Sequence, residues 1–190
     1  MSQFHDLVEE NPVIAAVKDM DGLEKSCRLE DIKVIFILFG DICTIGEIVE
    51  QIKVAGKTAM VHIDLVGGLN TKEITVDFIK NSTKADGIIT TRPILAQRAK
   101  EMSMYAVLRF FVIDSMALKN IEGLHMPRGI RPDFIEVLPG AMPKIIRRIC
   151  SSSPIPVIAG GLISDREDVT GALDAGAVAV SATNQDVWEM

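Results

Sequence analysis

The sequence predicts an α/β fold, a compact (β/α)8 barrel of the TIM type with a short C-terminal helix, in a single domain spanning residues 1–190. Two observations predict it. Short apolar segments alternate with helix-compatible segments along the whole chain, and these segments are apolar on both faces, as parallel strands covered by helices are. No segment is long enough to link two domains. Because the last helix is short, an open sheet of eight parallel strands is the alternative.

The expected strands are rich in Val, Ile, Leu and Phe. Consecutive strands are separated along the chain by a segment long enough for a helix or by a turn. Their length is typical of strands rather than of helices. We expect them at residues 13–17, 34–40, 59–66, 85–90, 105–112, 133–138, 156–160 and 177–181.

Helix signals lie between these strands. Ser164 and Asp165 form a start signal and Gly176 a stop signal, and Asp41 and Asp114 are expected to cap helices after the second and fifth strands. The segment 125–132 is the only irregular stretch rich in Pro and Gly, and it is basic. We expect helices at residues 46–55, 71–81, 93–102, 142–150 and 165–175, and short ones at 23–31 and 185–190.

The last two expected strands end in small residues. Gly160 and Gly161 close one strand, and Ser181, Ala182 and Thr183 close the next, one helix length later. The loops after the seventh and eighth strands of such barrels frequently bind phosphate. Glycines let the backbone approach an anion, and small polar residues open the N-terminal end of the next helical turn toward it. The sequence therefore predicts a site for a small phosphorylated molecule.

Polar residues interrupt several strands where a barrel is normally apolar. Strand residues alternate between the barrel interior and the helix-covered outside, and five polar residues are expected to point inward. All lie toward the carboxyl ends of their strands, where barrels place their chemistry. Together they predict one polar pocket. They are Lys18 at the end of the first strand, His62 and Asp64 on one face of the third, Arg109 in the fifth and Glu136 in the sixth.

Structural explanations exist for the same residues. Arg109 and Glu136 lie on neighbouring strands and could neutralise each other as a buried ion pair. His62 could be a satisfied core histidine, and Lys18 a solvated lysine at a strand end. Arg92 follows the fourth strand and is placed equally well for an anion contact or for exposure to solvent. The residues alone leave these alternatives open.

Composition and missing motifs narrow the function. With 48% hydrophobic and 24% charged residues the chain is typical of a soluble globular protein, and its net charge of −6 disfavours a general polyanion binder. Three scattered cysteines suggest neither disulfides nor zinc. The N-terminus lacks a signal core and the longest apolar run is far short of the roughly 20 residues that span a bilayer, so we expect a cytoplasmic protein without membrane contact.

No cofactor and no metal are expected. The chain contains no GxGxxG, GxxxxGK[ST], HExxH or GxSxG motif. A divalent metal would need clustered carboxylates, whereas Asp64 and Glu136 come from the third and sixth strands and should lie across the barrel. Instead of contacting a ligand, Asp64 could serve only to orient the side chain of His62.

Six short runs in order carry a family resemblance that extends from about residue 12 to the terminal VWEM. The runs are AAVKD (15–19), VHIDL (61–65), ADGIITTR (85–92), RFFVIDS (109–115), IEVLPG (135–140) and IAGGLI (158–163). With them the chain resembles the glycerol-3-phosphate-responsive antiterminators of bacterial glycerol-uptake operons.

This resemblance implies a regulator rather than an enzyme. Such a barrel would bind glycerol 3-phosphate and act on the leader of an mRNA so that transcription passes a terminator. The chain departs from the family pattern at Ala182, where a threonine is expected, and so lacks one hydroxyl for the phosphate. By position, the resemblance places in the ligand pocket Lys18, His62, Asp64, Arg92, Arg109, Glu136, Gly160, Gly161 and Ser181.

The sequence contains no aromatic RNA-binding motif and no long basic stripe. Ligand control of RNA binding would require two states, reached by ordering of the basic loop or by closure of a homo-oligomer. Solvated helix faces explain the basic residues equally well. The candidates for RNA contact are Arg128 and Arg131, then Lys144, Arg147 and Arg148, and finally Arg98 with Lys100.

An enzyme on the same scaffold is the alternative function. An aldolase or isomerase would use Lys18 as a Schiff-base nucleophile or Glu136 as a general base, and a glycerol-phosphate prenyltransferase would need Mg²⁺ and a long apolar groove. A third interpretation is a degenerate barrel that serves only as an interaction module. Interior charges argue against it, because buried charges without partners are costly.

Overall fold

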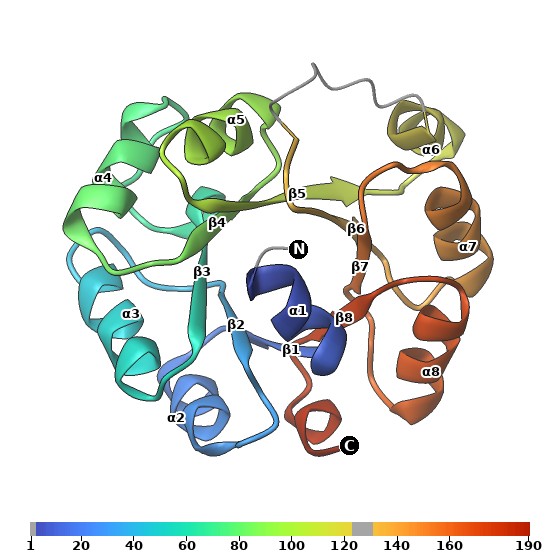
Figure 1. Ribbon diagram of the computed structural model, residues 1–190, viewed down its shortest axis with the longest axis horizontal. Helices are drawn as coiled ribbons and strands as arrows, with labels where there is room; N and C mark the ends of the chain where they lie inside the picture. Colours follow the sequence, from blue (N-terminus) through green and yellow to red (C-terminus); the bar gives the residue numbers. More distant parts are fainter. Residues whose placement is uncertain (1–2, 123–130) are drawn as a thin grey trace.

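A computed structural model describes residues 3–122 and 131–190 and shows a closed parallel barrel (Figure 1). The strands pair in chain order, and the last pairs with the first, with Ile14 of β1 beside Ser181 of β8. This pairing confirms the predicted barrel and excludes the open sheet. The strands are β1 (Val13–Val17), β2 (Val34–Ile37), β3 (Thr58–His62), β4 (Gly87–Thr90), β5 (Tyr105–Phe111), β6 (Phe134–Leu138), β7 (Val157–Gly160) and β8 (Ala179–Ala182).

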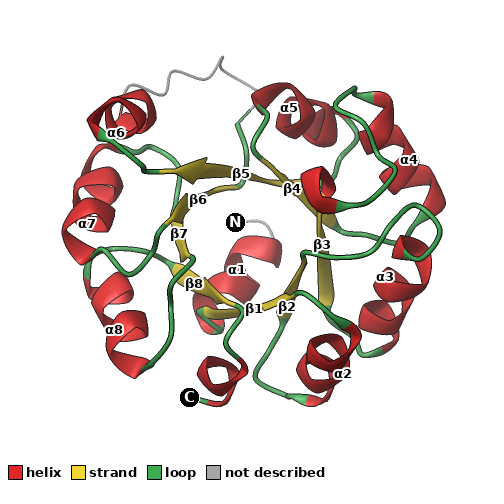
Figure 2. Cartoon of the chain, turned by 180° about the vertical axis from the view of Figure 1, so that it is seen from behind, coloured by secondary structure: helices red, strands yellow, loops and turns green. Residues whose placement is uncertain are grey.

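Seven helices cover the outside of the described barrel, and Figure 2 shows the same ring from behind. A 3-10 helix rather than an α-helix follows β8, which agrees with the predicted short last helix. The covering helices are α2 (Met20–Arg28), α3 (Ile45–Val54), α4 (Ile74–Ser82), α5 (Pro93–Glu101), α6 (Ser115–Glu122), α7 (Pro143–Ser152) and α8 (Arg166–Asp174), and the 3-10 helices are η1 (Ile63–Leu65) and η2 (Gln185–Glu189).

Two apolar cores follow from the alternation of strand residues. Residues such as Val17 and Ile37 point outward and pack beneath the helices. Residues such as Phe36, Met60 and Val107 point inward and fill the lower part of the barrel. Because inward positions recur every second residue, the polar residues of the same parity are carried into the upper part of the interior.

Helix α1 (Gln3–Glu10) closes the amino-terminal end of the barrel and lies at its centre in Figure 1. Phe4 is completely buried, stacks on Tyr105 at 4.6 Å between ring centroids, and meets Phe134 edge-on at 5.2 Å. This helix was not among those predicted from the sequence. Phe4, Leu7 and Val8 have the i, i+3, i+4 spacing of an amphipathic helix, which was the available signal. Closure at this end leaves the opposite end of the barrel for a ligand.

The third strand is shorter than expected, and the assignment of Asp64 to it was wrong. The strand ends at His62 and the chain turns into η1, because the Asp64 carboxylate binds the turn after β4 instead of continuing the ladder. The cap at Asp114 is confirmed, since its carboxylate accepts N–H bonds from Met116 and Ala117 at the start of α6. Asp41 is not the N-cap of α3, which is Thr44; its carboxylate accepts the N–H bonds of Cys43 and Thr44 in the turn before the helix. No helix among the described residues is long and apolar enough to cross a membrane.

Candidate functional site

A small pocket of about 80 Å³ opens at the carboxyl ends of the strands on the β5–β8 side of the barrel. Arg109 and Glu136 lie at its base, and the loops after β7 and β8 form its wall. Larger hollows exist on the helical surface, such as one of about 590 Å³ between α2 and α3, but no buried charged residue lines that one. The pocket is lined by Ala16, Leu38, Arg109, Glu136, Leu138, Gly161, Leu162, Ile163, Ser181, Ala182 and Thr183.

A buried chain of polar contacts forms the base of this pocket. Arg109 Nε donates to Glu136 Oε2 at 2.5 Å, and the Ser181 hydroxyl donates to Glu136 Oε1 at 2.5 Å. Glu136 is fully buried, and Arg109 is 8% exposed. Both carboxylate oxygens therefore have a partner, which offsets the cost of burying the charge. The ion pair predicted as the structural alternative is present, and Arg109 lines the pocket as well.

Gly160 is not among the residues that line the pocket, and packing by itself requires a glycine at this position. A Cβ at this position would lie 2.6 Å from both Glu136 Oε1 and the Ser181 hydroxyl. The glycine is therefore needed because the Glu136–Ser181 hydrogen bond passes directly over the backbone of β7.

We expect Gly160→Ala to destabilise the fold by about 1 to 3 kcal/mol, because the added methyl forces the buried carboxylate and hydroxyl apart. Urea unfolding of both proteins at neutral pH measures the difference. The same substitution at Gly46, whose Cβ would meet nothing nearer than 3.7 Å, is the control. Equal stability of Gly160→Ala and wild type would contradict this account of the packing.

The wall of the pocket offers unpaired backbone donors. Gly161 has φ +73° and Leu162 has φ +59°, so two successive residues adopt the left-handed conformation, and the Leu162 side chain is 75% exposed. Among the described residues the N–H groups of Gly161 and Thr183 donate no hydrogen bond. Both residues line the pocket, and unpaired N–H groups in the wall of a pocket are suited to an anion.

The two wall loops are tied together. Asn184 Nδ2, after β8, donates to the carbonyl of Ser164, after β7, at 2.8 Å. The indole N–H of Trp188 donates to the carbonyl of Ala182 at 2.8 Å, and Trp188 is buried. The role of Trp188 as an anchor of the pocket was not predicted from the sequence. This bracing holds the Gly161 and Thr183 donors at a fixed separation.

His62 points into the barrel interior as predicted and is 2% exposed. Its Nδ1 atom is buried without a hydrogen-bond partner in the described structure. Burial is the largest cause that lowers the pKa of His62, the Arg109 guanidinium adds to it, Asp64 partly opposes both, and together they bring the pKa to about 4. The imidazole is therefore neutral at physiological pH, with an unused polar atom deep in the barrel. It is not a satisfied core histidine.

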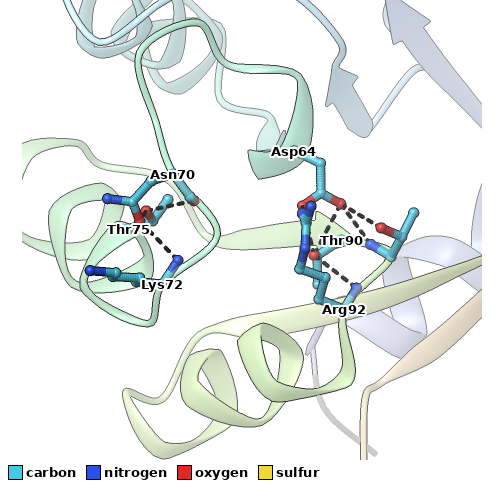
Figure 3. A network of polar contacts seen from close by, with 7 residues as sticks. Asp64, Asn70, Lys72, Thr75, Thr90 and Arg92 are labelled. Atoms are coloured by element: carbon cyan, nitrogen blue, oxygen red, sulfur yellow. Dashed lines mark hydrogen bonds and ion pairs between the residues drawn. The ribbon is translucent and has the colours of Figure 1, made fainter.

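Asp64 and Arg92 form a separate network at the ends of β3 and β4 (Figure 3). Arg92 Nη1 donates to Asp64 Oδ1, and Asp64 Oδ2 accepts the N–H of Thr91 at 2.7 Å and its hydroxyl at 3.1 Å. The Thr90 hydroxyl donates to the same carboxylate at 3.1 Å. Asp64 is thus occupied by the β4–α5 turn. Contrary to expectation, neither Asp64 nor Arg92 lines the pocket.

Lys18 is exposed and does not line the pocket, and it lies one residue beyond the end of β1 at Val17. The interior position with the same parity in β1 is Ala16, which does line the pocket. Among the described residues no group of three or more His, Cys, Asp or Glu side chains could hold a metal ion.

The candidate RNA contacts fall into three groups. Arg128 lies outside the described residues, and Arg131 is exposed in the segment that precedes β6. Arg98 pairs with Asp77 and Glu101, and Lys100 pairs with Asp133. The remaining candidates are exposed on α7 and are Lys144, Arg147 and Arg148.

Comparison with known proteins connects this barrel with a family of regulators. A sequence model described as glycerol-3-phosphate responsive antiterminator matches residues 13–188. The uncharacterized protein YgcP of Escherichia coli K12 is 42% identical over 184 residues, which cover 97% of this chain and 95% of YgcP. These matches extend over nearly the whole chain.

Solved structures give the same connection. A glycerol uptake operon antiterminator regulatory protein from Listeria monocytogenes is 34% identical, with a TM-score of 0.86 over 93% of this chain and 94% of that one. A glycerol uptake operon antiterminator-related protein from Thermotoga maritima is 35% identical, with a TM-score of 0.77 over 95% and 99%. Barrel enzymes at 14–18% identity also match, and that likeness concerns the fold alone.

Proposed function

The chain belongs to the glycerol-3-phosphate responsive antiterminator family, and from this premise we propose that it binds glycerol 3-phosphate in the β5–β8 pocket and thereby controls transcription antitermination on a leader mRNA. The observation that carries the proposal is the pocket itself. It combines unpaired backbone donors at its wall with a buried guanidinium at its base. This arrangement suits a small, singly phosphorylated polyol.

The two parts of the ligand have different partners in this proposal. The phosphate lies against the N–H groups of Gly161 and Thr183, where backbone dipoles favour an anion. The glycerol hydroxyls point into the barrel toward Arg109 at the base of the pocket. His62 does not line the pocket, but its buried Nδ1 has no partner in the described structure, and a ligand hydroxyl that reached it could donate to the neutral imidazole.

Two features support ligand sensing over catalysis. Both carboxylate oxygens of Glu136 already accept hydrogen bonds, from Arg109 and Ser181, so a substrate proton would have to compete with these two donors. Lys18 is exposed, whereas a Schiff-base lysine is normally activated by burial or a neighbouring cation. The pocket can bind a ligand without performing a reaction.

Calorimetric titration with sn-glycerol 3-phosphate tests the ligand, with glycerol and inorganic phosphate as controls. We expect micromolar binding that needs both the polyol and the phosphate, because each part contacts a different wall of the pocket. Absence of binding, or equal binding of inorganic phosphate alone, would contradict the proposal. Borohydride trapping of a lysine adduct with a carbonyl substrate would instead establish the enzyme alternative.

We expect Gly161→Ala to weaken glycerol 3-phosphate binding by at least about tenfold, the cost of roughly one lost hydrogen bond to an anion. The new Cβ would lie 3.1 Å from Leu138 Cδ2, which lines the pocket, and an L-residue disfavours φ +73°. Both effects displace the Gly161 N–H from the phosphate. Titration calorimetry of the variant measures the loss.

Gly56→Ala is the matched control. Gly56 also has φ +73°, but an added Cβ would meet nothing within 4 Å, and the residue lies between α3 and β3, at the end of the barrel away from the pocket. It therefore carries the same backbone strain without affecting the ligand. Unchanged ligand affinity in Gly161→Ala would show that the phosphate binds elsewhere.

A further inference from the structure

Helix α7 differs in charge from the other described helices. Its sequence, PKIIRRICSS, contains three cations and no acidic residue. Each of the helices α1 to α6 and α8 contains at least one acidic residue. Lys144, Arg147, Arg148 and Ser151 follow the i, i+3, i+4, i+7 spacing, so they share one face of the helix, and all four are exposed. A chain with a net charge of −6 thus concentrates positive charge on one exposed helix face.

An apolar hollow lies beside these cations. It has a volume of about 620 Å³ and is lined by Met142, Pro143 and Ile145 together with Lys144 and Arg147. Met142 is 41% exposed although it is a large apolar residue. Single-stranded nucleic acid binds surfaces on which bases stack against aromatic rings or Arg guanidinium planes while phosphates contact Lys and Arg. Here Arg147 supplies a guanidinium beside the apolar side chains of the hollow.

We propose that the α7 face, consisting of the 620 Å³ hollow and the cations Lys144, Arg147 and Arg148, is the surface that binds single-stranded RNA. This inference rests on the proposed function, because it assigns the RNA surface of the same regulator. An unstacked base occupies the hollow against Met142 and Ile145. Adjacent phosphates contact the cations along the helix.

Charge favours RNA over another copy of this chain as the partner. Two α7 faces brought together would oppose cation to cation, which is unfavourable, whereas each phosphate contact with RNA releases a counterion. The loops around the ligand mouth carry charges of both signs, since Asp19, Asp41, Asp114 and Asp165 lie on them together with Lys18 and Arg92, whereas the described face of α7 carries cations alone.

The α7 face and the ligand pocket are separated by only a few residues along the chain. Leu138 lines the pocket, and Met142, four residues later, lines the hollow. Between them, the N–H of Gly140 donates to the carbonyls of Gly160 at 2.5 Å and Gly161 at 2.9 Å. A ligand that contacts the Gly161 backbone therefore acts on the loop from which α7 starts, which provides a short physical connection between the two sites.

Binding of a random-sequence pool of single-stranded RNA, enriched on the wild-type protein with saturating glycerol 3-phosphate, tests the surface. We expect the double variant Lys144→Gln/Arg147→Gln to bind the enriched RNA at least about tenfold more weakly and to lower the salt dependence by about 0.7 for each lost phosphate contact. Met142→Glu should weaken binding as well, because it places a carboxylate in the hollow. Photocrosslinking of RNA containing 4-thiouridine should label residues 142–147.

The control variant Lys72→Gln/Lys80→Gln removes the same charge near α4, on the opposite side of the barrel (Figure 1). It should leave RNA affinity within about twofold of wild type. Calorimetry with glycerol 3-phosphate confirms that each variant is folded.

Three outcomes would overturn the inference. RNA affinity that is equal in the α7 variants and the wild type refutes the surface while the proposed regulator stands. Loss of self-association without loss of RNA binding assigns the hollow to a protein interface. If the wild type enriches no RNA, the surface and the RNA part of the proposed function both fail, and ligand binding alone decides whether the sensor remains.

Discussion

Replacing Arg109 with alanine is expected to lower the free energy of unfolding by about 3 to 5 kcal/mol, because it leaves the fully buried Glu136 carboxylate without its cation. The Ser181 hydroxyl alone does not compensate a charge at this depth. Urea unfolding at pH 7, followed by circular dichroism, measures the loss. We also expect glycerol 3-phosphate binding to disappear, since Arg109 lines the pocket.

A double variant separates the ion pair from the packing around it. Arg109→Met/Glu136→Leu removes both charges and keeps most of the volume, so we expect it to be more stable than Arg109→Ala alone. Lys84→Ala, which breaks the exposed pair with Glu50, should cost no more than about 1 kcal/mol. A loss of less than about 1 kcal/mol in Arg109→Ala would show that Glu136 is not held as a buried anion.

The barrel and the base of the site were predictable because both depend on a period of two along the strands. The parity that places Val107 and Phe134 inside the barrel also carries Arg109 and Glu136 inside, and His62 follows Met60 in the same way. Ser181 and Ile14 pair in the closing register. Local alternation therefore fixes which polar residues face the interior before any long-range contact is known.

The errors arose where tertiary contacts decide the outcome. Asp64 continues the apparent parity of β3, but the turn after β4 offers its carboxylate two hydroxyls, an N–H and a guanidinium, and the strand ends early. Lys18 lies one residue beyond the ladder of β1, where parity no longer applies. The role of Gly160 depends on a hydrogen bond between side chains of two other strands, which no local pattern contains.

Helix α1 was missed for a related reason. Its apolar spacing is visible in Phe4, Leu7 and Val8, but eight residues make a marginal helix in isolation. Docking of Phe4 onto Tyr105 and Phe134 stabilises it, and these partners lie about 100 and 130 residues away along the chain. Only the closed barrel brings them together.

Acid is expected to destabilise the protein through His62. The unfolded histidine binds a proton below its usual pKa of 6.5, whereas the folded one binds it only below about 4. Between these values the unfolded state holds more protons, so the stability contributed by neutral His62 is complete above pH 6.5 and is lost as the pH falls toward 4. Each pKa unit corresponds to 1.36 kcal/mol, so the contribution is roughly 3 kcal/mol.

Unfolding by urea at pH 7, 6, 5 and 4 measures this contribution when wild type is compared with His62→Leu, which cannot titrate at this position. The carboxylates titrate in both proteins, so the difference between the two pH profiles isolates the histidine. We expect the profile of His62→Leu to be flatter by roughly 3 kcal/mol over this range. Parallel profiles would mean that protonated His62 is accommodated in the folded barrel. The imidazole would then carry a positive charge beside Arg109 at mildly acidic pH, and its Nδ1 would no longer be available as an acceptor for a ligand hydroxyl.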